Sequence, residues 1–301
     1  MTEEYSLQRL WKNGTDVLQN AGVEEARLDA WLLLEYISGV SRAVYYAHPE
    51  IRLTEEQVSS YEELIRRRSC RIPLQHITHQ AFFMGHEFFV DERVLIPRQD
   101  TELLAELAIA LLQDRGKRKT ENTTPKILDM CTGSGCILIS ILLAAEEAEG
   151  LGADISADAL CVAEENAKRL GVDGRASFVK SDLFSGTVFL KNDGNRFTGY
   201  DMIVSNPPYI ASTEIERLSP EVRLHDPRIS LDGGEDGLSF YRRILQDAGR
   251  YLKKGGSLLL EIGFDQGEAL RQLAGEAGYT KIEVHRDLAG KDRVVSAVFA
   301  E

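Results

Sequence analysis

The residues Ser205 to Ile210 have the sequence Ser-Asn-Pro-Pro-Tyr-Ile and directly follow the apolar run Tyr200-Asp-Met-Ile-Val204. Such a run is typical of a buried strand, and two prolines at its end remove two backbone donors and fix two φ angles near about −65°. Because the carbonyls of Pro207 and Pro208 need not join a sheet ladder, they can face a pocket. The Asn206 amide can also accept and donate hydrogen bonds. We expect this corner to bind a planar –NH2 group, which would donate to the Asn206 side chain and the Pro207 carbonyl beneath the Tyr209 ring.

This arrangement suits a weak, conjugated nitrogen nucleophile, such as an amide or an exocyclic base amine. If both hydrogens are drawn aside, the nitrogen lone pair points at an electrophilic methyl group. Two neutral hydrogen bonds contribute only ~1–3 kcal/mol net, whereas alignment of the reacting atoms can remove ~7–11 kcal/mol of the barrier. Positioning therefore dominates, and no general base is needed before transfer. We expect Asn206, Pro207 and Tyr209 to be catalytic, and these three with Pro208 to bind the substrate. The alternative is a proline-capped strand end that binds nothing.

A glycine-rich loop, Asp129-Met-Cys-Thr-Gly-Ser-Gly135, lies between another apolar run and a helical pattern. An open α/β sheet binds nucleotide-like ligands at this position, and Gly133 and Gly135 let the backbone turn tightly. A dinucleotide fingerprint needs a third glycine three residues after the second, but residue 138 is Leu. Asp129 would also repel phosphate. S-adenosylmethionine has no phosphate, and its sulfonium and ammonium groups suit Asp129.

Two further carboxylates follow the next two apolar runs. Asp154 lies nineteen residues after Gly135 and can accept hydrogen bonds from both ribose hydroxyls. Asp182 can accept from the adenine amino group, while Leu183 packs against the ring. Each carboxylate alone is more typical of a solvated loop, but three at successive strand ends beside a glycine loop favour an S-adenosylmethionine site.

The pattern around these residues indicates an alternating β/α chain. The expected strands cover residues 127–130, 152–155, 176–179, 202–205, 257–262, 282–285 and 294–299. Helical patterns between them are typical of a mostly parallel, doubly wound sheet. Residues 81–96 are rich in aromatic and β-branched side chains around Gly85-His86 and predict a hairpin. The first seventy-odd residues follow helical periodicity, and the capping box Thr54-Glu-Glu-Gln57 opens one of these helices.

Composition argues against several classes of protein. The 301 residues carry a net charge of −13, whereas a protein that binds duplex DNA usually has a basic face, so we expect no direct binding to nucleic acid. The first residues do not form a signal peptide, and no apolar run approaches the ~18 residues of a membrane span. We expect a cytoplasmic protein with no membrane contact. Its four cysteines show no metal-binding or disulfide spacing, and we expect them to be reduced.

Other polar clusters have ordinary interpretations. His76, His79 and His86 fall in a loop and a hairpin without cysteines nearby, and we expect no metal site. The basic run Arg66-Arg-Arg68 with Arg71 is either a solvated helix C-terminus, where cations suit the helix dipole, or a contact with a partner.

Three rival functions remain. An amino-methyltransferase acting on adenine or guanine would need a basic face to hold a flipped base. A non-catalytic cofactor-binding protein would show damage to the loop or the corner. A nicotinamide oxidoreductase is opposed by Leu138.

A series of motifs runs in order along nearly the whole chain: Pro73-Leu-Gln75, Val94-Leu-Ile-Pro-Arg98, Asp129 to Cys136, Ser205 to Ile210, Asp232 to Leu238 and Asp287 to Arg293. In this order they closely resemble the glutamine methyltransferases of peptide chain release factors, the PrmC or HemK family. The resemblance implies that S-adenosyl-L-methionine methylates the side-chain amide of the glutamine in the Gly-Gly-Gln loop of class 1 release factors and leaves S-adenosyl-L-homocysteine. Class 1 release factors are therefore the expected partners, and we expect the protein to be a monomer.

The resemblance also implies an architecture and a set of site residues. It implies an N-terminal helical substrate-recognition domain over residues 1–75, a β-hairpin linker over 76–97, and a Rossmann-like, seven-stranded class I methyltransferase domain over 98–301. The cofactor residues it implies are Cys131, Thr132, Gly133, Ser134, Gly135, Asp154, Leu183 and Asn206. Arg98 should lie near the cofactor pocket, although Gln99 stands where the family usually has a second proline.

Overall fold

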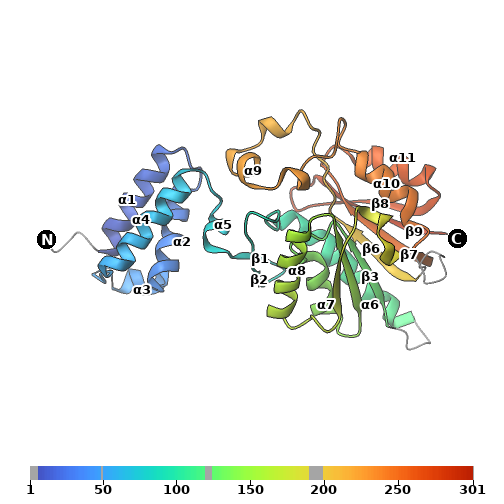
Figure 1. Cartoon of the computed structure of the whole chain (residues 1–301), viewed down its shortest axis with the longest axis horizontal. Coiled ribbons are helices and arrows are strands. Elements are labelled where there is room, and N and C mark those ends of the chain that lie inside the picture. The colour runs from blue at the N-terminus through green and yellow to red at the C-terminus, as the bar shows by residue number, and fades with distance from the viewer. Residues whose placement is uncertain (1–5, 49, 119–123, 190–198, 301) are drawn as a thin grey trace. The chain divides into compact units, whose positions relative to one another are not determined.

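The computed structural model describes residues 6–48, 50–118, 124–189 and 199–300, which form two compact units (Figure 1). The first unit comprises the chain up to Gln80 together with Ser219–His225, and the second comprises Ala81–Leu218 and the chain from Asp226 on. The two are called here the helical unit and, after the domain that the resemblance implies, the methyltransferase unit. The functional domains expected at residues 1–75, 76–97 and 98–301 stay predictions.

The helical unit consists of short helices around one apolar core. Its helices are α1 (Leu7–Asn20), α2 (Ala26–Ser38), α3 (Arg42–Ala47), α4 (Glu55–Ser69), α5 (Leu74–Thr78) and α9 (Pro220–His225). Trp31 and Leu34 of α2 and Tyr61 of α4 are among the buried core residues. The predicted capping box is confirmed, because Thr54 Oγ1 accepts from the Gln57 backbone and the Gln57 side chain accepts from the Thr54 backbone.

The close approach of α1 and α4 depends on a glycine. Tyr61 Oη lies 3.3 Å from the Leu10 carbonyl and 3.2 Å from the Ala30 carbonyl, and so it joins α4 to α1 and α2. A Cβ on Gly14 would lie 2.1 Å from this hydroxyl and 2.9 Å from Tyr61 Cζ. Gly14 is therefore needed where the tyrosine ring packs across α1.

The arginines at the end of α4 lie in two different environments. Arg66 is exposed and pairs with Glu63 at 2.6 Å, as expected of a solvated helix end. Arg68 is instead buried and pairs with Asp29 at 2.7 Å, so the expectation of a solvated side chain is wrong for this residue.

The methyltransferase unit contains a seven-stranded sheet in the order β5-β4-β3-β6-β7-β9-β8. The strands are β3 (Lys126–Met130), β4 (Glu149–Asp154), β5 (Ala176–Lys180), β6 (Tyr200–Ser205), β7 (Leu252–Glu261), β8 (Tyr279–Arg286) and β9 (Asp292–Phe299). Pairing is parallel from β5 to β7, and β9 is antiparallel to both β7 and β8. All seven predicted strands and the mostly parallel sheet are confirmed.

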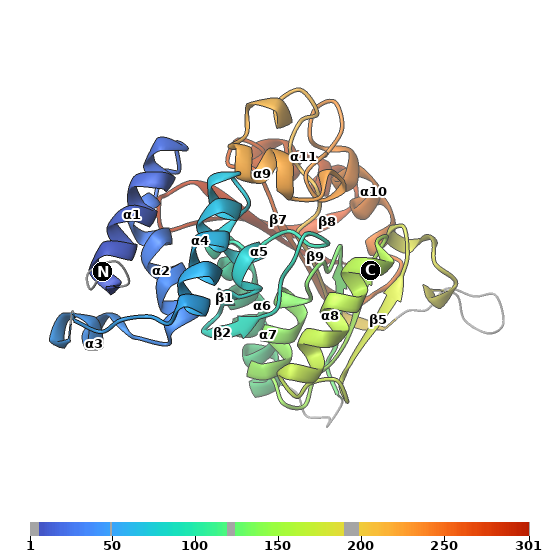
Figure 2. The ribbon, with the colours of Figure 1, turned by 60° about the vertical axis from the view of Figure 1, so that its left-hand side comes forward.

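Helices cover both faces of this sheet. Helices α6 (Glu102–Arg118), α7 (Cys136–Ala144) and α8 (Ala157–Arg169) lie on one side, and α10 (Ser239–Ala248) and α11 (Gly267–Glu276) on the other (Figure 2). Side chains of a strand alternate between the faces. Ile127 packs with α6 and α7, whereas its neighbour Leu128 packs with α10 and α11.

The predicted hairpin is present but short. Strands β1 (Ala81–Phe83) and β2 (His86–Phe88) pair across the two-residue turn Met84-Gly85, in which both residues have positive φ. This backbone twist matches that of paired strands. Pairing ends at Phe88, so the expectation of a hairpin reaching residue 96 is wrong in extent. Residues 89–98 continue without strand structure.

We predict that Gly14→Ala destabilises the helical unit. Alanine favours a helix by up to ~1 kcal/mol over glycine, but forcing a methyl group against Tyr61 costs ~1–3 kcal/mol, and we expect the clash to dominate. Thermal unfolding followed by circular dichroism measures the change. Gly275→Ala in α11 is the matched control, because its Cβ would meet nothing closer than 3.8 Å, and it should be neutral or stabilising. An unchanged or higher melting temperature for Gly14→Ala would contradict the packing described.

Candidate active site

A cavity of about 240 Å³ lies in the methyltransferase unit at the carboxyl ends of the central strands. The residues that follow four of these strands line it: Cys131 to Ser134 after β3, Asp154 to Ser156 at the end of β4, Ser181 to Leu183 after β5, and Asn206 and Pro208 after β6. The structure thus brings most of the predicted cofactor and substrate residues to one cavity. Asp129, Gly135, Pro207 and Tyr209 are not among the lining residues.

The glycine loop is held by hydrogen bonds to both neighbouring strands. Thr132 Oγ1 donates to Asp129 Oδ2 at 2.6 Å, and the Thr132 N–H donates to the Ala153 carbonyl at 3.1 Å. Gly135 has φ +79 and caps α7, and a Cβ there would lie 2.9 Å from Ile139 Cδ1. Cys131 also has a positive φ, of 62°, which is uncommon for a residue with a side chain. The loop is therefore a fixed, tight turn rather than an open one.

Asp129 supports the loop from below. Its side chain is fully buried, and desolvation raises its pKa to about 7 in spite of the hydrogen bond from Thr132. The sequence suggested that Asp129 would meet the cationic groups of the cofactor. In the structure its Oδ2 accepts from the Thr132 hydroxyl, and its Oδ1 has no hydrogen-bond partner among the described residues. Its contact with the cofactor stays a prediction.

Asp154 lines the cavity directly. Its Oδ2 accepts from the Gly133 N–H and its Oδ1 from the Ser156 N–H, each at 2.9 Å. Desolvation raises the pKa of Asp154, against the effect of these hydrogen bonds. Backbone donors thus fix the carboxylate at the end of β4, beside the glycine loop.

Asp182 and Leu183 also line the cavity, at the end of β5. Asp182 Oδ1 accepts from Arg243 Nη2 at 2.7 Å, and this ion pair is about half exposed. Leu183 is buried and has a φ of 49°, so the backbone is turned sharply at the cavity wall. The sequence did not indicate Arg243, because a single arginine in a helix carries no signal of a contact with a residue sixty positions away.

Another wall of the cavity comes from two segments, of which the resemblance to the family placed only Arg98 near it. Residues 93–97 fall in the expected hairpin linker, and Arg98 is the residue that the resemblance places near the cofactor pocket. Pro227, Ile229 and Ser230 belong to no expected site. Arg98 Nη2 pairs with Asp226 Oδ2 at 2.6 Å and so joins the two segments. Burial raises the pKa of Asp226 to about 6, against the opposing charge of Arg98. The position of Arg98 agrees with what the resemblance implied.

The Asn-Pro-Pro-Tyr corner is held by hydrogen bonds to residues outside the glycine loop. Asn206 Nδ2 donates to Thr101 Oγ1 at 3.3 Å, and the Tyr209 carbonyl accepts from Gln266 Nε2 at 3.0 Å. Tyr209 Oη lies 3.4 Å from Glu261 Oε1, a long contact. Thr101, Gln266 and Glu261 are thus supporting residues that the sequence reading missed.

Glu261 is the most unusual of these, since it is a carboxyl group in the interior. It is 1% exposed, and its Oε2 has no hydrogen-bond partner among the residues that the structure describes. Desolvation raises its pKa to about 7, against the opposite effects of the Thr101 hydroxyl and the Arg293 guanidinium. The only sequence signal was a single acidic residue at the end of an apolar strand.

Within the described residues 6–48, 50–118, 124–189 and 199–300, no helix is both long and apolar enough for a membrane span. The same residues contain no group of three or more His, Cys, Asp or Glu side chains placed to hold a metal ion.

The fold and the cavity together define a class. A seven-stranded sheet with one antiparallel strand inserted beside β7, and a glycine loop and acidic residues at the ends of β3 to β5, is the architecture of a class I S-adenosylmethionine-dependent methyltransferase. The hMettl16 catalytic domain, solved in complex with the MAT2A 3'UTR hairpin 6, shares this fold with a TM-score of 0.54, over 79% of this chain and 83% of that one, at 15% identity.

The sequence comparisons identify the family. The PrmC N-terminal domain family matches residues 9–78, and the methyltransferase small domain family matches residues 108–221. The chain is 38% identical to the release factor glutamine methyltransferase of Caulobacter vibrioides, over 97% of this chain and 96% of that protein. It is also 38% identical to the release factor glutamine methyltransferase of Chlorobaculum tepidum, over 99% of both chains. The chain belongs to the release factor glutamine methyltransferase family.

We predict that Glu261→Gln changes the dependence of stability on pH. The pKa of Glu261 is about 7 in the folded protein against the usual 4.5, so folding takes up a proton between these values. The contribution of Glu261 to the free energy of unfolding is therefore greatest below pH 4.5 and falls as the pH rises through 7. Glutamine has no charge to bury, so the variant should gain melting temperature relative to the wild type at pH 8 and not at pH 5.

The size of this effect follows from the energy of burying the charge. Burial of the ionised carboxyl group costs a few kcal/mol of unfolding free energy at pH 8. Each kcal/mol shifts the melting temperature by ~2–4 °C in a large domain. Calorimetric scans of both proteins at pH 5 and pH 8 provide the comparison. Glu149→Gln, at an exposed position of β4, is the control and should show no such difference. An equal shift at both pH values would mean that Glu261 is not held against ionisation.

Proposed function

We propose that this protein transfers the methyl group of S-adenosylmethionine to the side-chain amide nitrogen of the glutamine in the Gly-Gly-Gln loop of class 1 release factors. The observation that carries the proposal is that Asn206 and Pro208 line the same cavity as the glycine loop and Asp154. The corner that would bind the amide and the loop that would bind the cofactor therefore line one cavity, so the two reactants could meet there. The names of the full-length relatives supply the acceptor.

The residues of the cavity suit S-adenosylmethionine better than a phosphate-bearing cofactor. Each of the three arginines in the wall is already paired: Arg93 with Asp91, Arg98 with Asp226 and Arg243 with Asp182. Asp154 has no cationic partner among the residues that the structure describes, and it is held by two backbone N–H groups. The cavity therefore favours hydroxyl donors or a cation over an anion.

The roles of individual residues follow from their positions. Asp154 would accept from the ribose hydroxyls, Leu183 would cover the adenine ring, and the loop Cys131 to Gly135 would approach the cofactor closely. When bound, S-adenosylmethionine supplies an electrophilic methyl group on a positively charged sulfur. Asp182 already has Arg243 as a partner, so it would contact the adenine amino group while sharing its carboxylate with that arginine.

Asn206 has the central role in binding the acceptor. Because its Nδ2 donates to Thr101, its Oδ1 is the atom left to accept a hydrogen from the substrate amide. The Pro207 carbonyl would accept the second hydrogen, and the Tyr209 ring would cover the amide plane. Drawing both hydrogens aside turns the nitrogen lone pair toward the methyl group, and this alignment is the main contribution of the chain to the rate.

We further propose that the protein is a cytoplasmic monomer that recognises its release factor through the helical unit. A net charge of −13 supports a protein substrate over a nucleic acid, since phosphate groups would be repelled. The three-part domain organisation expected from the sequence is part of this proposal.

The experiment that tests the function is methyl transfer from labelled S-adenosylmethionine. The purified protein is given, in parallel, a class 1 release factor, the same factor with the loop glutamine replaced by alanine, and duplex DNA with adenine and guanine. We expect label on the first substrate alone. Label on the alanine variant would place the acceptor elsewhere on the factor, and label on DNA would establish the rival amino-methyltransferase of nucleic acid.

We predict that Asn206→Ala lowers kcat for the release factor by at least ~10²-fold, the loss typical when a positioned hydrogen-bonding group is removed from an active site. The dissociation constant of S-adenosylmethionine, measured by calorimetry, should rise only modestly. Tyr209→Phe is the matched control, because the ring remains and only the long contact with Glu261 is lost, so most activity should persist. Near-full turnover by Asn206→Ala would exclude the acceptor geometry described.

A further inference from the structure

One segment of the chain leaves the methyltransferase unit and belongs to the helical unit. After Leu218 the chain enters the helical unit for residues Ser219–His225, and it returns at Asp226. This segment contains the short helix α9, none of whose side chains is buried. No buried apolar side chain therefore holds it in place, whereas it makes several short polar contacts.

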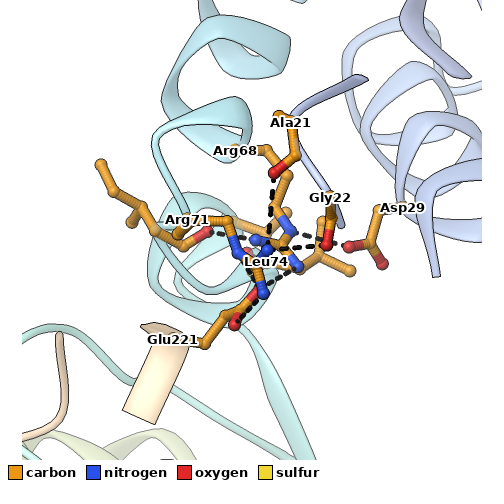
Figure 3. A network of polar contacts seen from close by, with 9 residues as sticks. Ala21, Gly22, Asp29, Arg68, Arg71, Leu74 and Glu221 are labelled. Atoms are coloured by element: carbon orange, nitrogen blue, oxygen red, sulfur yellow. Dashed lines mark hydrogen bonds and ion pairs between the residues drawn. The ribbon is translucent and has the colours of Figure 1, made fainter. Parts of the chain in front are cut away.

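The polar contacts centre on Glu221 (Figure 3). Arg71 donates to both carboxylate oxygens, from Nε at 2.7 Å and from Nη2 at 2.6 Å, and Arg68 Nη2 donates to Oε1 at 3.0 Å. Arg68 Nε donates in turn to Asp29 Oδ2 at 2.7 Å. Two cations and two anions thus form one balanced network, called here the Glu221 network. A two-pronged arginine–carboxylate pair of this kind fixes orientation as well as distance.

The arginines are themselves held rigidly. The Arg68 side chain is only 7% exposed. Arg71 Nη1 donates to the Gly22 carbonyl at 2.7 Å, and its backbone has a φ of 69°, a conformation that a residue with a side chain rarely adopts. Burial acts to raise the pKa of Glu221, but the hydrogen bonds from Arg71 and Arg68 outweigh it and lower the pKa to about 2. Glu221 is therefore ionised at every pH at which the protein would work.

The chain on either side of the segment leads directly to the cavity. Pro227, Ile229 and Ser230, which follow it, line the cavity. The Asn-Pro-Pro-Tyr corner precedes it, and the two sides are joined where Ile210 N–H donates to the Leu231 carbonyl at 3.0 Å and Gly233 N–H to the Ile210 carbonyl at 2.8 Å. The segment is thus the tip of a closed loop, and the base of that loop carries the acceptor corner and one cavity wall.

We propose that Glu221 is a positioning residue for methyl transfer: its clamp by Arg68 and Arg71 fixes the tip of this loop, and thereby the acceptor side of the cavity. The inference rests on the proposed function and adds a residue that does not line the cavity. It assigns the helical unit a part in the rate of the reaction, in addition to any part in recognising the release factor. These two parts affect different kinetic constants.

The test compares Glu221→Gln with Glu214→Gln. The first variant keeps the shape of the side chain but removes the charge that Arg68 and Arg71 share. The second removes an exposed ion pair with Arg217 in the same loop and serves as the matched control. For each protein, kcat and KM for the release factor are measured with saturating S-adenosylmethionine, and the dissociation constant of S-adenosylhomocysteine is measured by calorimetry.

For Glu221→Gln we expect kcat to fall by about tenfold or more, since small misplacements can cost up to ~10²-fold in rate. KM and the dissociation constant should change by less than about threefold, and Glu214→Gln should match the wild type. If kcat stays within about twofold of the wild type, the proposal is overturned, and a rise in KM alone would assign the network to recognition. Failure of the wild type to label the release factor would instead overturn the proposed function.

A folding defect is separated from a positioning defect by a second variant. If Glu221→Gln melts below the assay temperature, Arg71→Lys is measured by the same criteria, because lysine keeps the charge but loses the two-pronged pairing. A fall in kcat for a folded Arg71→Lys supports the proposal. If both variants unfold, the network is needed for folding only and the proposal is wrong.

Discussion

The site depends on the pairing of β3 with β4 on one side and with β6 on the other. From β3 the chain runs outward to β4 and β5, and then returns across the sheet to β6. The loops after β3 and β6 therefore leave the same edge of the sheet in opposite directions, with a space between them. The alternation of strand side chains between two cores fixes the register of all three strands, because a slip by one residue would expose both cores. The glycine loop and the Asn-Pro-Pro-Tyr corner are adjacent for this reason.

Burial also changes the pKa values of the acidic residues at this edge of the sheet. Asp129, Asp154 and Glu261 are carboxyl groups in the interior, and desolvation raises the pKa of each. Asp129 and Asp154 accept hydrogen bonds from the loop that they shape. These bonds offset part of the free-energy cost of burying the two carboxyl groups. For Asp129 and Glu261 this compensation is only partial, since one oxygen of each has no hydrogen-bond partner within the described part of the chain. Strain and buried charge of this kind collect at functional sites and are offset by the packing of the rest of the fold.

Local patterns could be predicted from the sequence, and contacts between distant residues could not. The seven strands follow from short apolar runs, and the capping box at Thr54 from four neighbouring residues. Gly85-His86 marked the hairpin to within one residue of its turn, but nothing in the composition of residues 89–96 showed that pairing would end at Phe88. The pairs Arg98–Asp226 and Arg68–Glu221 join residues 128 and 153 positions apart. A single charged residue has no period, so its partner is determined only once the elements are packed.

The two sides of the cavity are therefore specified in different ways. The cofactor side consists of residues that end parallel strands, and backbone hydrogen bonds and a buried core determine where they lie. The wall that we expect to hold the acceptor depends on side-chain contacts between segments outside the sheet, above all Arg98–Asp226 and Asn206–Thr101. A few substitutions can alter such contacts without disturbing the sheet, whereas the glycine loop cannot change without moving β3 and α7. The sheet and the glycine loop can therefore be kept while the side-chain contacts of the other wall change. This is why the fold defines the class of this protein, whereas the family is defined by the sequence of the whole chain.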